Sequence, residues 1–236
     1  NDAESMAQTL QEHCGFTLLQ PPLLGSDATS ANVKKAVLAL ARERTDTDFL
    51  LLYFSGHGQP MTISDDQSDI YLGTSDFNER ETEEDENLHC SMRWLQRKLY
   101  LPTQAGKVLL ILDCCNAGNM GRTAPDPYLE DLKMRISRYF DAPGTASGAR
   151  AGGLRQALTA TSHNQPAHEQ EGHGVMTGPL LECLQGNVDD VIDLDDRGNV
   201  SLQRLHDYLL RVMPEDQNPS VSGDYAGRKC ILAQYE

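Results

Sequence analysis

The chain has 236 residues and a mass of 26.1 kDa, which suits one large domain whose core needs no disulfide or structural metal. Acidic residues outnumber basic ones by 35 to 20, and the formal charge of -15 disfavours nucleic acid, whose phosphates bind excess positive charge. No apolar run approaches the roughly 18–20 residues that cross a bilayer, so we expect no membrane partner.

In the first half of the chain, amphipathic helices alternate with apolar strands. The spacing of apolar residues predicts a helix from residue 3 that stops at Gly15, and a strand at 16–19. A second helix follows at 30–40, with Thr29 or Ser30 as its cap. A fully buried strand is predicted at 48–55, a short strand at 70–72, and a solvated acidic loop at 79–87.

The second half continues the alternation. We expect a helix capped by Ser91 with Met92, Leu95 and Leu99 on its buried face, and then a second fully buried strand at 106–113. The remaining predictions are a helix around 129–136, a flexible linker at 141–153, strands at 154–161 and 230–233, and helices at 176–184 and 201–212. Strands separated by helices predict an α/β sandwich with a mostly parallel sheet.

Cysteine usage favours a reducing, cytoplasmic environment. The six cysteines form no CxxC pair, and the adjacent Cys114 and Cys115 cannot close an ordinary disulfide. We expect several of them to be buried as small apolar residues. The first residues, Asn1 to Glu4, already fit a helix and include no initiator Met, so we expect the natural protein to begin upstream.

Two motifs lie just past the ends of the two buried strands, where open α/β sheets bind their ligands: FSGHG (54–58) and DCCNAG (113–118). A His and a Cys on neighbouring strands can come within hydrogen-bond reach, so that the imidazole generates a nucleophilic thiolate. The nearby glycines let backbone N–H groups approach and stabilise an oxyanion. Either motif alone is more often structural, but their combination points to nucleophilic catalysis.

YFSGHG and ILDCCNAG resemble the two signatures of caspase-like cysteine peptidases, most closely metacaspases and bacterial caspase-like proteins. The resemblance continues through LTATS (158–162), HGVMTGPLLECLQG (173–186) and DLDDRGNVSLQRLHDYL (193–209). It implies an α/β, caspase-like three-layer sandwich with a mostly parallel central sheet flanked by helices.

The resemblance also implies one peptidase domain over residues 1–236. Residues 1–140 would be the large-subunit-like part, 141–153 the linker, and 154–236 the small-subunit-like part. The family's usual first strand is absent here; it is expected upstream, on a separate or uncleaved piece, unless another segment fills its place.

Residue by residue, the resemblance makes His57 the general base and Cys115 the nucleophile, with the backbone N–H groups of Gly58 and Cys115 as the oxyanion hole. Asp113 matches the metacaspase acid that lines the S1 pocket and selects Arg or Lys. The alternative for Asp113 is a strand-end residue that bonds nearby N–H groups. Strand alternation places Asp113 and Cys115 on one side and Cys114 on the other, which favours Cys115 as the reactive thiol. No third catalytic side chain is identified.

The expected activity is therefore cleavage of protein or peptide substrates after basic residues, Arg before Lys. Family members are often cut in the segment after the nucleophile, which predicts self-cleavage near Arg150; the alternative is a passive loop whose Arg is merely solvated. An upstream or partner regulatory segment is expected, and the bacterial relatives often serve in defence or programmed cell death. The rival hypotheses are a separase-like or CHAT-type peptidase with another P1 choice, and an inactive scaffold that binds a protein partner. Retention of both His57 and Cys115 argues against the scaffold.

No metal site or cofactor is predicted. The histidines at 163, 168 and 173 match no zinc pattern, and the stretch at 193–204 lacks the ligands of an EF-hand. Ca²⁺ activates some metacaspases, and Asp65, Asp66 and Asp69 could bind it, but a solvated acidic loop is the alternative.

Overall fold

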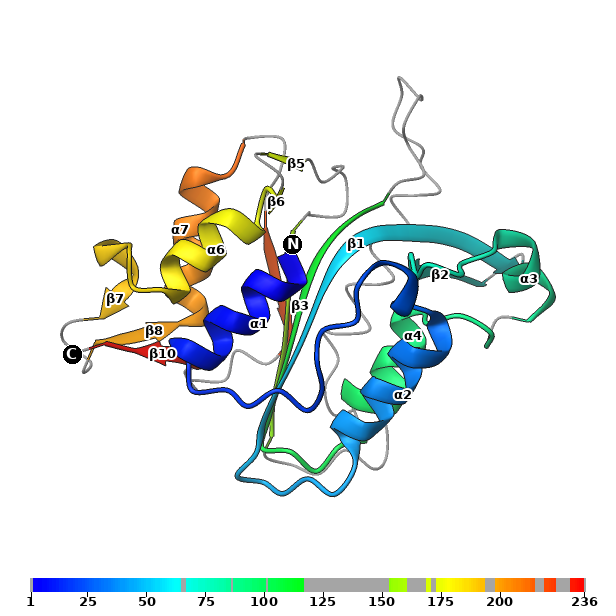
Figure 1. Cartoon of the computed structure of the whole chain (residues 1–236), viewed down its shortest axis with the longest axis horizontal. Coiled ribbons are helices and arrows are strands. Elements are labelled where there is room, and N and C mark those ends of the chain that lie inside the picture. Colours follow the sequence, from blue (N-terminus) through cyan, green and yellow to red (C-terminus); the bar gives the residue numbers. More distant parts are fainter. Residues whose placement is uncertain are drawn as a thin grey trace.

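A computed structural model describes residues 2–64, 67–85, 87–100, 102–116, 153–160, 169–170, 173–193, 198–214, 219–223 and 230–235. Its centre is a five-stranded sheet in the order β2-β1-β3-β4-β9 (Figure 1). The three inner strands are parallel and the two outer strands antiparallel, so the sheet is mixed with a parallel centre. The strands are β1 (Phe49–Ser64), β2 (Gln67–Leu72), β3 (Lys107–Asn116), β4 (Leu154–Thr159) and β9 (Ser220–Gly223).

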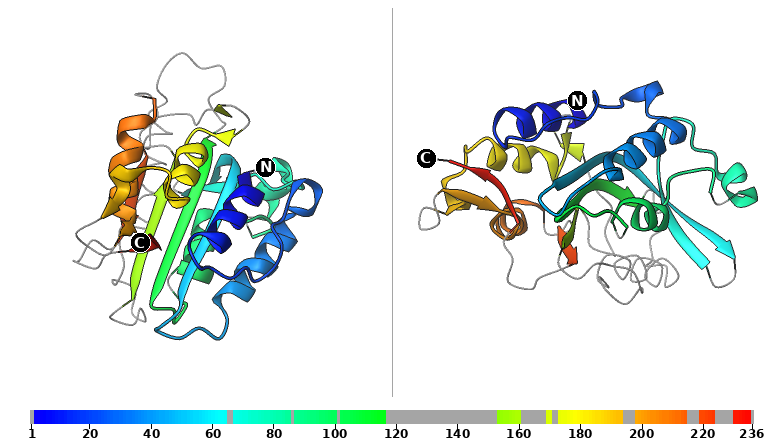
Figure 2. Two further views of the ribbon diagram at one scale, coloured as in Figure 1. Left: turned by 60° about the vertical axis from the view of Figure 1, so that its left-hand side comes forward. Right: turned by 90° about the horizontal axis from the view of Figure 1, so that it is seen from below.

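Helices cover both faces of this sheet (Figure 2). On one face lie α1 (Asp2–Glu12), α6 (Thr177–Leu184) and α7 (Leu202–Val212), which share a core cluster with Leu109 and Ile111 of β3. On the other face lie α2 (Ser30–Ala41) and α4 (Met92–Leu95), which continues into the π-helical turn η2 (Gln96–Tyr100); their core cluster includes Leu110 and Leu112. Successive side chains of β3 thus enter opposite layers, and the predicted three-layer sandwich is confirmed.

The buried strand β3 anchors both layers. The four side chains at 109–112 are each at most 1% exposed, and burial of one such side chain is worth about 1.5–3 kcal/mol. Because this packing holds β3 firmly, it also fixes the position of the strand end that carries residues 113–116.

Several short elements lie around the main sheet. The predicted strand at 230–233 is present as β10 (Ile231–Gln234), but it joins a separate three-stranded sheet with β8 (Asn199–Ser201) and β7 (Ile192–Asp193). The remaining elements are η1 (Gly25–Asp27), η4 (Asp189–Val191), α3 (Glu79–Glu84), and the pair β5 (Glu169–Gln170) and β6 (His173–Gly174).

Side-chain caps confirm three predicted helix starts. Thr29, Ser91 and Ser201 each accept a hydrogen bond from a backbone N–H in the first turn that follows. These residues occupy an extended backbone position just before the helix, where a hydroxyl can satisfy a first-turn N–H group.

Two local predictions are wrong. The acidic stretch at 79–87 contains the helix α3, because Asn78 caps it and glutamates in the first turn suit the positive end of the helix dipole. Residues 16–19 form no strand. The predicted helix around 129–136 and all but the last residue of the linker 141–153, Arg150 included, lie outside the described residues. Within the described part of the chain, no helix has the length and apolar character needed to cross a membrane.

Candidate active site

The parallel pairing of β1 and β3 brings the two predicted catalytic positions together. The register begins with Phe49 opposite Lys107 and ends with His57 opposite Cys115 and Gly58 opposite Asn116. Neighbouring strands lie about 4.8 Å apart, so residues 57 and 115 are adjacent at the carboxyl end of the pair. His57 is exposed there, and the side chain of Cys115 lies outside the description.

Gly73 positions the backbone of His57 and was not identified from the sequence. Its N–H donates to the His57 C=O at 2.7 Å. A Cβ on Gly73 would lie 2.9 Å from the same oxygen and 3.0 Å from the His57 Cβ. Only glycine therefore permits this approach without moving His57. The sequence feature that could have identified Gly73 is its position directly after the short strand predicted at 70–72.

Asp113 and Cys114 point to opposite layers. Cys114 packs against the cluster under α2 and α4, whereas Asp113 contacts the first residue of α6 on the other face. Asp113 is 4% exposed; its carboxylate accepts hydrogen bonds from the Thr177 backbone N–H at 3.0 Å and from the Thr177 hydroxyl. The Tyr53 hydroxyl lies 2.6 Å from the same Thr177 oxygen. An N-terminal N–H of a helix is a natural donor to a carboxylate, so Asp113 makes the contacts expected of a strand-end residue.

Asp2 is a second carboxylate at this end of the sheet. Its Oδ2 accepts hydrogen bonds from the Ser55 hydroxyl at 2.7 Å and from the Gly174 N–H at 3.0 Å. A Cβ on Gly174 would collide with the carboxylate of Asp113. Asp2 and Asp113 therefore converge on Gly174. In the sequence, Asp2 is distinguished only as part of a helix start, because an acid in a first helical turn is too common to indicate more.

The hydrogen-bonding pattern between β1 and β3 constrains the predicted oxyanion hole. The Lys107 N–H donates to the Asp48 C=O at 3.1 Å, which identifies the even-numbered residues of β1 and the odd-numbered residues of β3 as facing each other. Continued to the strand ends, this alternation aims the N–H groups of Gly58 and Cys115 at the partner strand. These groups can bind an oxyanion only if the two strand ends separate.

Other cysteines are poor candidates for the nucleophile. Cys90, Cys183 and Cys230 are buried, as predicted, and burial raises the pKa of each thiol to about 12. Burial also raises the pKa of Cys14 to about 11. A thiol with such a pKa carries almost no thiolate at neutral pH, so Cys114 and Cys115 remain.

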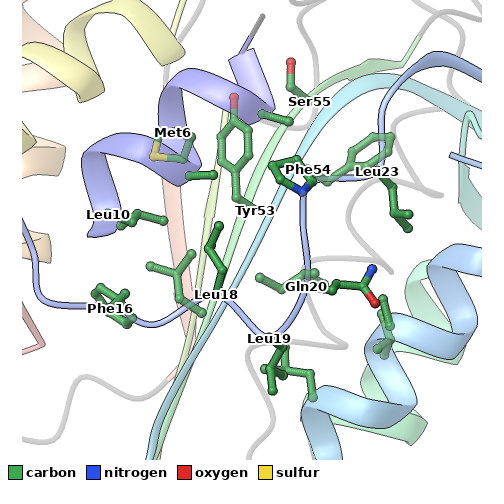
Figure 3. Close-up of a pocket in the computed structure, with 18 of the residues that line it drawn as sticks. Met6, Leu10, Phe16, Leu18, Leu19, Gln20, Leu23, Tyr53, Phe54 and Ser55 are labelled. Atoms are coloured by element: carbon green, nitrogen blue, oxygen red, sulfur yellow. The ribbon is translucent and has the colours of Figure 1, made fainter. Parts of the chain in front are cut away.

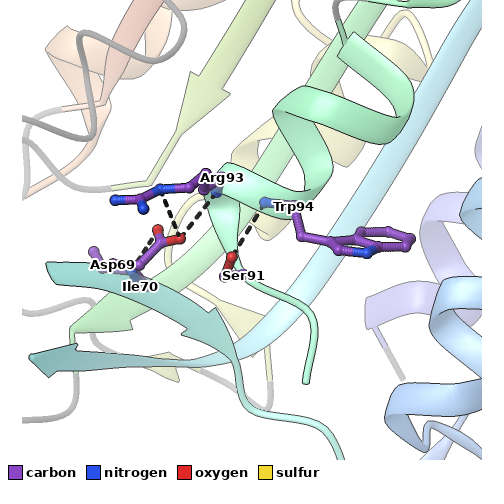
Figure 4. A network of polar contacts seen from close by, with 5 residues as sticks. All are labelled: Asp69, Ile70, Ser91, Arg93 and Trp94. Atoms are coloured by element: carbon purple, nitrogen blue, oxygen red, sulfur yellow. Dashed lines mark hydrogen bonds and ion pairs between the residues drawn. The ribbon is translucent and has the colours of Figure 1, made fainter. Parts of the chain in front are cut away.

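Asp69, one of the possible Ca²⁺ ligands, is buried rather than part of a solvated loop. It is 1% exposed; its Oδ1 accepts from the Ile70 N–H at 2.9 Å and its Oδ2 from the Arg93 N–H at 3.2 Å (Figure 4). The Arg93 Nε lies 3.9 Å from Oδ2, and Ser91 caps α4 beside them. Asp69 therefore serves the packing of β2 against α4. Asp65 and Asp66 lie outside the described residues.

Comparison with known proteins agrees with the geometry. The model of the caspase-domain peptidase family matches residues 1–225. The chain belongs to this family. The crystal structure of protein GSU0716 from Geobacter sulfurreducens is similar, with a TM-score of 0.66 and 21% identity over 100% of this chain and 89% of that one. At that identity the similarity shows the fold alone. No curated protein matches the chain.

Proposed function

We propose that this caspase-family chain is a cysteine endopeptidase that uses a His57–Cys115 dyad. The observation that carries the proposal is the β1–β3 register, which makes residues 57 and 115 neighbours at the end of the parallel sheet. His57 would take the proton of the Cys115 thiol, and the thiolate would attack the scissile carbonyl carbon. The leaving amine takes the proton from His57, and a water activated by His57 then hydrolyses the thioester and restores the thiol.

Stabilisation of the tetrahedral intermediate would come from the backbone N–H groups of Gly58 and Cys115. Because the ladder aims both groups at the partner strand, the proposal includes a local separation of the strand ends beyond Gly56 and Cys114. Ladder ends open at low cost compared with the sheet centre. Substrate binding would favour the open form by supplying an oxyanion for these donors.

Cleavage after Arg, with Lys second, is supported by the carboxylates of Asp2 and Asp113. Both approach Gly174, beside the end of β1 that carries His57. Two carboxylates at one place favour a guanidinium, which can donate charge-assisted hydrogen bonds to both, over the single ammonium group of Lys. The negative charge of the whole chain adds attraction for cationic peptides.

A library of peptides that differ only at P1 tests this function, with the Cys115→Ala variant as the control for a contaminating protease. We expect turnover after Arg, weaker turnover after Lys, none after Asp, and no activity in the variant. Turnover after another residue type would favour the separase-like or CHAT-type alternative. A folded wild-type chain without turnover of any peptide would favour the scaffold.

The same specificity would permit self-processing near Arg150, in a Gly- and Ala-rich stretch. Wild-type protein and the Cys115→Ala variant are incubated side by side, and fragment termini are read by mass spectrometry. We expect a new terminus after Arg150 in the wild type alone. An intact active enzyme, or equal cutting of both samples, would contradict self-processing.

A further inference from the structure

Tyr53 is linked by hydrogen bonds to both of the carboxylates that support the proposed specificity. Its hydroxyl oxygen lies 2.6 Å from the Thr177 hydroxyl oxygen, and the Thr177 hydroxyl in turn donates to Asp113. Tyr53 also forms a side-chain hydrogen bond with Ser55, whose hydroxyl donates to Asp2 at 2.7 Å. Three hydroxyl groups, those of Thr177, Tyr53 and Ser55, therefore form a continuous hydroxyl row between Asp113 and Asp2.

The hydroxyl row joins elements that are far apart in the sequence. Tyr53 and Ser55 are two residues apart on β1, so their side chains lie on the same face of the sheet. Figure 3 shows the Tyr53 ring on the side of α1 and Phe54 on the other side of the strand. Thr177 begins α6, and Asp2 begins α1. The row thus holds the starts of both helices against β1.

The direction of each bond follows from the hydrogens available. An ionised carboxylate only accepts, so the Thr177 hydroxyl gives its one hydrogen to Asp113. Tyr53 is then the donor to Thr177, and burial, which raises the pKa of Tyr53, keeps that hydrogen in place. Ser55 has one hydrogen and two acceptors, the Tyr53 oxygen and the Asp2 carboxylate. Loss of the Tyr53 hydroxyl would therefore alter the surroundings of both acids.

Two carboxylates at one place repel each other, so their orientation needs restraint. Asp2 accepts from the Gly174 N–H at 3.0 Å, and a Cβ on Gly174 would collide with Asp113, so both acids lie against one residue. A guanidinium donates from a rigid planar fork, whereas an ammonium is a compact charge on a flexible stem. A fork gains more than a point charge from acceptors in fixed positions. Restrained carboxylates therefore favour Arg over Lys.

We propose that Tyr53 is a positioning residue that sets the preference for Arg over Lys at P1. Its hydroxyl fixes the orientation of the Asp113 carboxylate through Thr177 and that of the Asp2 carboxylate through Ser55. This role rests on the proposed preference for basic P1 residues and not on the chemical step.

Peptide binding to the Cys115→Ala chain tests this role without turnover. Isothermal titration calorimetry gives the Kd of three peptides that differ only at P1, with Arg, Lys or the neutral arginine analogue citrulline. Tyr53→Phe should weaken binding of the Arg peptide about 2–10-fold, the worth of one hydrogen bond, and weaken the Lys peptide less. The matched control is Tyr208→Phe. Tyr208 lies on α7 against the core cluster of the same layer, and its variant should leave the ratio of the two Kd values unchanged.

A second pair of variants tests the row at its other hydroxyl. Thr177→Ser keeps a hydroxyl and should keep the Arg preference, whereas Thr177→Val has the same shape without a hydroxyl and should reduce it. Tyr53→Phe should lower the preference much less in the Thr177→Val chain than it does alone, because the row toward Asp113 is already broken. If Tyr53→Phe does not fold, the two Thr177 variants decide the question.

Three results would overturn the role of Tyr53. The first is an Arg preference that is the same in Tyr53→Phe, or in Thr177→Val, as in the parent chain. The second is an equal loss in Tyr208→Phe or Thr177→Ser, which would indicate packing rather than the hydroxyl row. The third is equal binding of the Arg, Lys and citrulline peptides by the parent, which would also remove the basic P1 preference. A Tyr53-dependent Arg preference in a chain whose wild-type form cleaves no peptide would support this role and contradict the peptidase activity alone.

Discussion

Asp113 and Asp69 are two buried carboxylates with similar exposure and different surroundings. Each accepts a backbone N–H at the start of a helix, from Thr177 of α6 and from Arg93 of α4, respectively. Asp69 also faces the guanidinium of Arg93, a positive charge from its own chain. Asp113 accepts a hydroxyl bond as well and shares its end of the sheet with a second carboxylate, Asp2. Burial alone therefore does not identify a binding site; convergence of like charges beside the proposed catalytic dyad is the more informative feature.

The largest expected effect on activity distinguishes Cys115 from Cys114, the two thiols at the end of β3. Cys115→Ala and His57→Ala should each lower kcat/KM by roughly 10⁴-fold or more, because removal of either partner removes the covalent route. Cys114→Ala should keep most activity, since Cys114 packs into the α2 layer. Steady-state assays on an Arg-P1 peptide make the measurement. A dead Cys114→Ala enzyme beside an active Cys115→Ala enzyme would reverse the assignment.

Neutral replacements of Asp113 and Asp69 test whether the two buried carboxylates have different roles. Asp113→Asn should lower kcat/KM for Arg-P1 peptides by about 10–100-fold, the loss of one charged hydrogen bond, and Asp2→Asn should act in the same direction. The matched control is Asp69→Asn, which should leave the ratio of Arg to neutral P1 turnover unchanged. An Arg preference that survives in Asp113→Asn would assign this residue a structural role only.

The elements of the fold and their layered arrangement were largely predictable from the sequence, whereas the strand register and the individual contacts were not. Thr29, Ser91 and Ser201 are local signals, so the helix starts could be located within a residue. The register that opposes His57 to Cys115, and the approach of Asp2 to Gly174, join residues far apart in the chain. No local pattern encodes them. The strand expected at 16–19 failed for the same reason, because a strand depends on a partner that composition does not reveal.

Removal of the Asp69 carboxylate should destabilise the fold without a change in specificity. In a Cys115→Ala background, Asp69→Ala should lower the free energy of unfolding by about 2–3 kcal/mol, because the N–H groups of Ile70 and Arg93 lose their buried acceptor. The matched control is Asp190→Ala. Asp190 pairs with Arg211 at 3.3 Å on the exposed surface, where such a pair contributes about 0.5 kcal/mol or less. Equal losses in urea denaturation would contradict the role of Asp69.

The pH dependence of this carboxylate has a definite sign. Burial raises the pKa of Asp69 above its ordinary 3.8, so between the two values the folded chain binds more protons than the unfolded chain. Stability from this group therefore falls as pH rises from about 3.8 through the folded pKa. The free energy of unfolding of the wild-type chain, measured relative to that of Asp69→Asn, should therefore be larger at the acid end of that window than at neutral pH. Urea denaturation at several pH values measures the difference, and an opposite slope would show that Arg93 outweighs burial.

The smallest expected effect compares two serine caps. Ser91 accepts the Trp94 N–H at 3.1 Å and also bonds Asp69, whereas Ser201 accepts the Arg204 N–H at 3.3 Å. Ser201→Ala should therefore cost about 1 kcal/mol of unfolding free energy, the usual worth of a cap. Ser91→Ala should cost up to about 1 kcal/mol more, since a buried carboxylate loses a donor as well. The extra loss should vanish when Asp69→Asn is already present, because a neutral amide gains less from the hydroxyl. A Ser91→Ala loss equal to that of Ser201→Ala, unchanged by Asp69→Asn, would show that Ser91 acts as a cap alone.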